Sequence, residues 1–148
     1  LKAQLRTDLT TAMKARDELS AATLRMALTA ITNEEVSGKT ARELTDADVL
    51  VVLGREAKKR KEAAEAFDAA DRAELADRER AELTVLERYL PAQMSDDDLV
   101  AIITDAVTTV GPGGMRNMGA VMKIVQPQVV GRADGGRVAA EVRRQLGQ

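Results

Sequence analysis

The sequence of 148 residues contains no cysteine and no histidine, and these two absences limit the chemistry it can perform. Without cysteine there is neither a disulfide nor a thiolate nucleophile. Without histidine the chain lacks the commonest general base and the commonest metal ligand. Lysine or glutamate could still act as a base, so an enzyme is disfavoured rather than excluded. We assign no catalytic residue and predict neither a metal nor a cofactor.

Aromatic residues and long apolar runs are also scarce. Phe67 and Tyr89 are the only aromatic residues, so the C-terminal part has no side chains on which nucleic-acid bases could stack. No apolar run approaches the roughly 20 residues that a membrane-spanning helix needs. We therefore expect a soluble cytoplasmic protein without a membrane partner.

The residues that are present favour helices. Alanine and leucine dominate the apolar set, and charged residues make up 31% of the chain. Alanine, leucine, glutamate, arginine and lysine lose little free energy on entering a helix. No segment sustains the alternation of apolar and polar residues that is typical of a strand. The sequence predicts an all-α protein.

Apolar stripes at helical spacing predict about four helices in the first part of the chain and three in the last part. The fourth helix is expected to end at Leu90, because a residue that precedes proline is pushed away from helical geometry. Residues 91–94 form the best linker. The prediction is two helical lobes, an N-terminal domain over 1–91 and a three-helix bundle over 95–148.

Several residues mark expected helix ends. Ser20 is a candidate cap for the second helix, and Thr45 with Asp48 has the pattern of a capping box. Pro127 is expected to stop the sixth helix, because its ring removes a donor and clashes with the preceding turn. Asp134 can cap the last helix through its carboxylate.

Two charged runs have a structural explanation and a functional one. The run from Lys58 to Lys61 could bind phosphates, but a solvated helix face is favoured, since neutralising acids lie at helical spacing. The run from Asp96 to Asp98 could be read as metal ligands. A capped helix start whose dipole is complemented by acidic residues is the favoured interpretation.

The C-terminal part differs in charge from the rest. From Gly111 onward there are six basic and two acidic residues, a net charge of +4, whereas the whole chain carries −2. This part contains a glycine-rich turn, residues 131–136, between two predicted helices. The turn could cradle an anion at a helix N-terminus. It could equally be a tight connection whose glycines supply positive φ, and the residues leave both interpretations open.

If this part binds RNA, we expect few contacts, and we expect them to be electrostatic. Its basic side chains can contact the phosphate backbone of the RNA, whereas it has no aromatic side chain that could stack on a base. We predict one patch centred on the turn. Its candidate RNA-binding residues are Lys123, Arg132, Arg137, Arg144, Gly131 and Gly135.

The order and spacing of short motifs along nearly the whole chain resemble the GatB/YqeY family, in its short free-standing form. The matching positions include Asp8, Leu24-Arg25-Met26, Glu56, Arg60-Lys61, Glu82-Leu83, Tyr89-Leu90-Pro91, Met118-Gly119, Val121-Met122-Lys123, Pro127 and Gly131-Arg132-Ala133-Asp134-Gly135.

The resemblance implies a four-helix N-terminal part and a three-helix C-terminal part. The latter is similar to the tail domain of the B subunit of tRNA-dependent amidotransferases. That tail helps to hold tRNA, whereas the kinase and transamidase sites lie elsewhere in the complex. The family label, a carbon–nitrogen ligase with glutamine as amido-N-donor, thus comes by association. Two main hypotheses remain: a non-catalytic tRNA-contacting accessory module, or a helical adaptor for protein assembly without an RNA role, whose partner would be a protein of the translation machinery. An amidotransferase-linked enzyme is a third, less favoured hypothesis.

Overall fold

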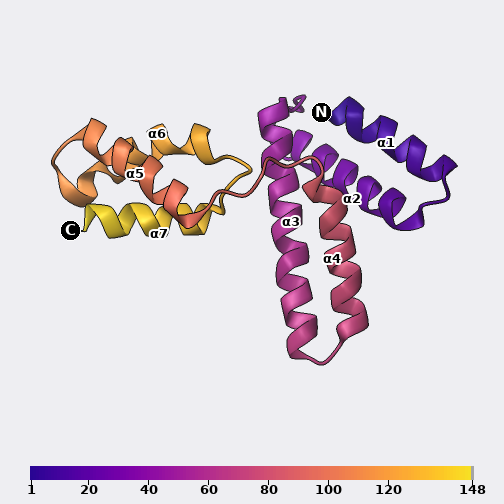
Figure 1. The fold of residues 1–148 in the computed structure, drawn as a ribbon. Coiled ribbons are helices and arrows are strands. Elements are labelled where there is room, and N and C mark those ends of the chain that lie inside the picture. The colour runs from indigo at the N-terminus through magenta and orange to yellow at the C-terminus, as the bar shows by residue number, and fades with distance from the viewer. Residues whose placement is uncertain (148) are drawn as a thin grey trace. The chain divides into compact units, whose positions relative to one another are not determined.

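A computed structural model describes residues 1–147, and in that range the chain is all α-helical, as predicted (Figure 1). Seven α-helices and one short 3-10 helix account for its regular structure, and no strand occurs among the described residues. The elements in chain order are α1 (Lys2–Lys14), α2 (Glu18–Glu35), α3 (Asp46–Ala69), α4 (Ala73–Glu87), α5 (Asp96–Val110), η1 (Gly114–Asn117), α6 (Met118–Val129) and α7 (Gly135–Leu146).

The helices form two compact units, one over Leu1–Leu90 and one that begins at Pro91. They are called the N-terminal unit and the C-terminal unit below. Residues 91–95, here the entry segment, lead into α5. Met94 of this segment is only 3% exposed and belongs to the C-terminal core. The entry segment therefore packs as part of the C-terminal unit and not only as a connection.

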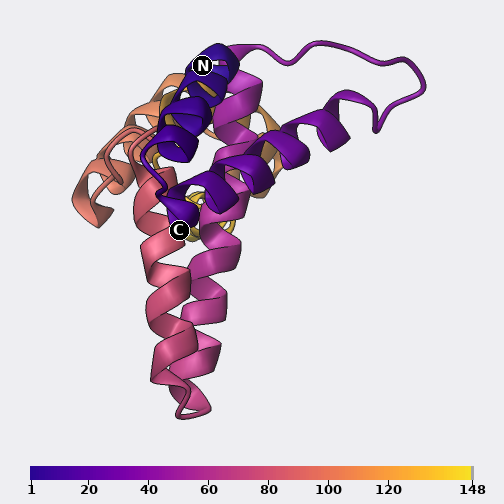
Figure 2. The same ribbon diagram turned by 90° about the vertical axis from the view of Figure 1, so that its right-hand side faces the viewer.

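The N-terminal unit consists of two helical hairpins. The α1–α2 turn and the α3–α4 turn each contain a residue with a left-handed backbone, Arg16 and Asp71, both at φ 57°. The longer α3–α4 hairpin extends well beyond α1 and α2 (Figure 2). All four helices contribute to one apolar core, in which Leu5, Leu53 and Leu86 are almost fully buried. Each such side chain contributes about 1.5–3 kcal/mol through its burial.

The C-terminal unit packs α5, α6 and α7 around a second core. Its central side chains are branched and lie three or four residues apart on each helix, as the apolar stripes predicted. None is more than 2% exposed: Leu99, Ile103, Val121, Val125, Val138 and Val142. No helix in the described part of the chain is long and apolar enough to cross a membrane.

Two of the predicted helix caps need correction. The cap of α2 is Asp17, whose carboxylate accepts from the backbone amide of Ser20 at 3.1 Å. The prediction that Ser20 caps this helix is wrong, because the helix starts three residues earlier than expected. Asp134 does occupy the N-cap position of α7, but its side chain makes no capping hydrogen bond there. The capping box of Thr45 and Asp48 is confirmed.

Pro127 does not stop α6, which continues to Val129. A proline so close to a helix end removes only one intrahelical bond, the one to the carbonyl of Lys123. Val125 and Val129 on either side of it are buried in the C-terminal core. Packing of these two valines holds the last turn in helical geometry.

Candidate nucleic-acid interface

The glycine-rich turn joins α6 to α7, and its two site glycines have different roles. Gly131 has φ 73°, a left-handed conformation that residues with a side chain rarely adopt. Gly135 is the first residue of α7, and a Cβ added there would meet nothing within 4 Å. The backbone geometry therefore favours glycine at position 131 but leaves position 135 open to larger residues.

Arg132 and Arg137 bind the entry segment. The Arg132 carbonyl accepts from the Met94 amide at 2.8 Å, and its Nε donates to the Ala92 carbonyl at 3.3 Å. Arg137 donates to the Met94 carbonyl at 2.9 Å and to the Asp96 carboxylate at 2.7 Å. These contacts give both arginines a structural role within the C-terminal unit. They hold the entry segment, which leads into α5, against the residues at the start of α7.

Arg144 is also engaged. It donates to Glu141 from Nε at 2.8 Å and from a terminal nitrogen at 2.5 Å, and Gln145 donates to the same carboxylate at 3.0 Å. The hydrogen bonds from Arg144 and then Gln145 lower the pKa of Glu141 to about 2. The charge of Arg144 is therefore neutralised by Glu141 on the same helix.

Among the four candidate basic residues, Lys123 is the one whose charge has no partner in the described chain. Its side chain is exposed on α6 and makes no hydrogen bond or ion pair with any residue from 1 to 147. The structure brings Arg132 and Arg137 together at the entry segment. Arg144 follows Arg137 by seven residues, or about 10 Å along the helix. No contact joins Lys123 to the other three, and a single patch stays a prediction.

The sequence reasoning passed over two further bases of this unit. Arg143 is exposed on α7 and makes no ion pair in the described chain, and Arg116 donates only to the Gly113 carbonyl, at 3.3 Å. With Lys123 and Arg132 they are the four cations from Gly111 onward that have no carboxylate partner among residues 1–147. The sequence contained a signal for Arg143, because an acid three residues before Arg144 predicts that Arg144 is paired and leaves Arg143 free.

In the N-terminal unit, the basic run from Lys58 to Lys61 is not a uniformly solvated face. Arg60 is only 5% exposed and donates to the Glu56 carboxylate at 2.7 Å. Glu82 of α4, itself buried, lies 3.6 Å from Arg60 Nε. Arg60 follows Leu53 and Ala57 at the spacing of the buried stripe, which is why its side chain faces α4. The group is an ion-paired part of the helix packing.

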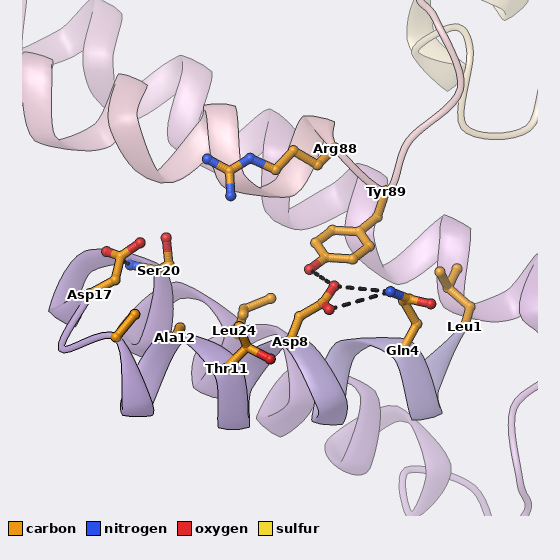
Figure 3. Close-up of a pocket in the computed structure, with 11 residues that line it drawn as sticks. Leu1, Gln4, Asp8, Thr11, Ala12, Asp17, Ser20, Leu24, Arg88 and Tyr89 are labelled. Carbon is orange, nitrogen blue, oxygen red and sulfur yellow. Dashed lines mark hydrogen bonds between the residues drawn. The ribbon is translucent and has the colours of Figure 1, made fainter.

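The N-terminal unit also has an open groove of about 640 Å³ between α1, α2 and the end of α4 (Figure 3). Asp8 lies on its α1 side and accepts a hydrogen bond of 2.5 Å from the Tyr89 hydroxyl. Gln4 donates to the same carboxylate at 3.3 Å. Burial and the bond to Asp8 raise the pKa of Tyr89. No sequence pattern links residues 81 positions apart, so this pair could not be predicted.

Two helical units, the second of which ends in a basic stretch from Gly111 onward, define a class of small all-α protein. A family model described as Yqey-like protein matches residues 2–146. The chain therefore belongs to the YqeY-like family. It is also similar to an uncharacterized protein of Schizosaccharomyces pombe, with 38% identity over 97 residues, which is 65% of this chain and 76% of the yeast protein.

Proposed function

We propose that this protein is a non-catalytic accessory module that contacts tRNA in the cytoplasm through its C-terminal unit. The observation that carries the proposal is the set of four cations from Gly111 onward that find no carboxylate partner in the described part of the chain: Arg116, Lys123, Arg132 and Arg143. The relation of the family to the amidotransferase tail supports the choice of tRNA as the ligand.

The basic residues of the C-terminal unit would contribute to RNA binding in two ways, according to whether they already have a partner within the unit. Lys123 and Arg143 can approach phosphates without giving up an internal partner. Arg132, Arg137 and Arg144 can add to the local potential while they keep their contacts within the unit. The first amides of α7, at Gly135, add partial positive charge at the glycine-rich turn. Recognition would then read the backbone and shape of the RNA, because the unit has no aromatic side chain.

The salt dependence of binding tests this proposal. Fluorescence anisotropy of labelled tRNA, titrated with the protein between about 50 and 200 mM salt, should give a modest affinity that falls steeply with salt. Each neutralised phosphate contributes roughly −0.7 to −0.9 to the slope of log K against log salt, so four contacts give a slope of about −3 to −4. A slope near zero, or no binding at low salt, would contradict the proposal.

A protein-assembly adaptor is the second candidate, and exposed methionines favour it. Met13 is 53% exposed and Met26 is 47% exposed, both on the N-terminal hairpin of α1 and α2. Methionine is a flexible apolar side chain that suits adaptable protein contacts. Capture of a defined protein partner that resists high salt, together with no tRNA binding at low salt, would favour the adaptor.

A further inference from the structure

The groove of the N-terminal unit carries opposite charges that do not pair with each other. Asp8 lies on α1, and its only hydrogen-bond partners in the described chain are neutral, the Tyr89 hydroxyl and the Gln4 amide. Arg88 reaches over the groove from the end of α4, and within residues 1–147 it makes neither a hydrogen bond nor an ion pair (Figure 3). Asp17 also lines the groove, where hydrogen bonds from Ser20 and the charge of Arg88 lower the pKa of its carboxyl. Asp8 and Arg88 thus face one space, and Arg88 forms no direct ion pair with either carboxylate in the described chain.

The remaining lining is suited to a small molecule with an apolar part. Ala12, Ala15 and Leu24 supply apolar surface between the charged groups. The volume of about 640 Å³ is well within the range of ligand sites in proteins and exceeds that of one amino acid. The opening to solvent lets such a molecule enter without movement of a helix.

We propose that this groove binds a small zwitterion, a molecule with an ammonium group for Asp8 and a carboxylate for Arg88. A carboxylate that accepts only neutral hydrogen bonds retains its full charge and has lone pairs left for an ammonium group. A guanidinium offers two parallel donors to a ligand carboxylate. The Asp8–Tyr89 bond fixes the carboxylate at the groove, which lowers the cost of ordering it when the ligand binds.

The chain provides its own probe of this site. Tyr89 is the only tyrosine and there is no tryptophan, so ultraviolet emission of the protein reports on the side chain that is bonded to Asp8. An ammonium group that binds Asp8 changes the environment of the Tyr89 hydroxyl. Its emission should therefore change with saturation as a zwitterion is added.

The experiment titrates the whole chain with leucine and with two analogues that each lack one charge, 3-methylbutylamine and 4-methylpentanoate. We expect leucine to bind at millimolar concentration or below and each analogue to bind about tenfold more weakly, since a charge-assisted hydrogen bond contributes that much. Equal binding of leucine and either analogue, or no saturable change with leucine, would overturn the proposal.

Substitutions locate the two charges. Asp8→Asn keeps an acceptor for Tyr89, and Arg88→Gln leaves the Asp8–Tyr89 bond untouched, so the second variant tests the site even where the first is unstable. Each should weaken leucine binding about tenfold. Arg72→Gln, an exposed change in the same unit outside the groove lining, is the control and should bind like the wild type. Unchanged binding in Arg88→Gln would overturn the assignment.

Discussion

Arg137 joins α7 to the start of α5 by bonding to Asp96, with 2.7 Å between its terminal nitrogen and the carboxylate. The same nitrogen donates to the Met94 carbonyl at 2.9 Å. The residue therefore connects α7 to the entry segment as well as to the start of α5. It follows that a charge reversal at position 137 perturbs the packing of the C-terminal unit as well as its surface charge.

Replacement of Arg137 should destabilise this unit. Arg137→Ala removes the bonds to Met94 and Asp96, and we expect a loss of about 1–2 kcal/mol in the free energy of unfolding, because Asp96 is largely exposed and water screens that pair. Asp96→Asn should cost less, since the Met94 contact remains. Urea unfolding followed by NMR signals of α7 measures both. An Arg137→Ala variant as stable as the wild type would contradict this role.

The entry segment should be needed for full stability of the C-terminal unit. A fragment of residues 91–148 is expected to unfold cooperatively, whereas a fragment of 95–148 lacks the buried Met94 side chain. Loss of a buried methionine side chain costs about 2–5 kcal/mol in intact proteins. Thermal unfolding by circular dichroism compares the two fragments. Equal melting temperatures would show that Met94 adds nothing to the core, and a disordered 91–148 fragment would show that the unit does not fold alone.

Removal of Arg60 should be costly in the N-terminal unit. Arg60→Ala leaves Glu56 and the buried Glu82 without their shared cation, and we expect a loss of roughly 2–4 kcal/mol, near the range for broken buried ion pairs. Lys61→Ala, the next residue on the exposed face, is the matched control and should change stability by less than about 0.5 kcal/mol. Chemical denaturation of the two variants checks this, and equal effects would refute a special role for Arg60.

The C-terminal unit should lose stability in acid through Glu141. Its pKa in the folded protein is about 2, below the ordinary value of 4.5, so its stabilisation is complete above pH 4.5 and declines as the pH falls toward 2. Glu141→Gln removes the charge and should flatten this part of the profile. Urea unfolding at several pH values, followed by NMR signals of α7, tests the difference. Parallel profiles for wild type and variant would contradict the expectation.

Local patterns were enough to predict the helical fold, because apolar residues such as Leu99, Ile103 and Ala106 recur every three or four positions along each helix. The positions of the charged side chains were harder to predict. Arg132 and Arg137 resembled free bases because their acceptors include backbone carbonyls of the entry segment, about 40 residues away, which no side-chain pattern reveals. Arg60 could have been found, since it lies on the stripe that faces α4.

The groove lay beyond sequence reasoning for a related reason. Asp8 and Tyr89 meet only once α1 and the end of α4 are packed together, and neither residue has a local pattern that predicts the other. The N-cap of α2 was also placed at the wrong residue, Ser20, by sequence reasoning. A serine near a helix start is a good cap candidate, but the competing Asp17 comes earlier in the chain and took that position.

A comparison of two double charge reversals tests the central claim, that free cations of the C-terminal unit contact tRNA. One variant carries Lys123→Glu and Arg143→Glu, and the matched control carries Lys39→Glu and Arg72→Glu at exposed positions of the N-terminal unit. Both change the net charge equally, so any difference reports on location. Anisotropy at about 50 mM salt should show a loss of affinity of at least about tenfold for the first and less than about threefold for the control. Equal losses in the two variants, or no loss in the first, would contradict the account.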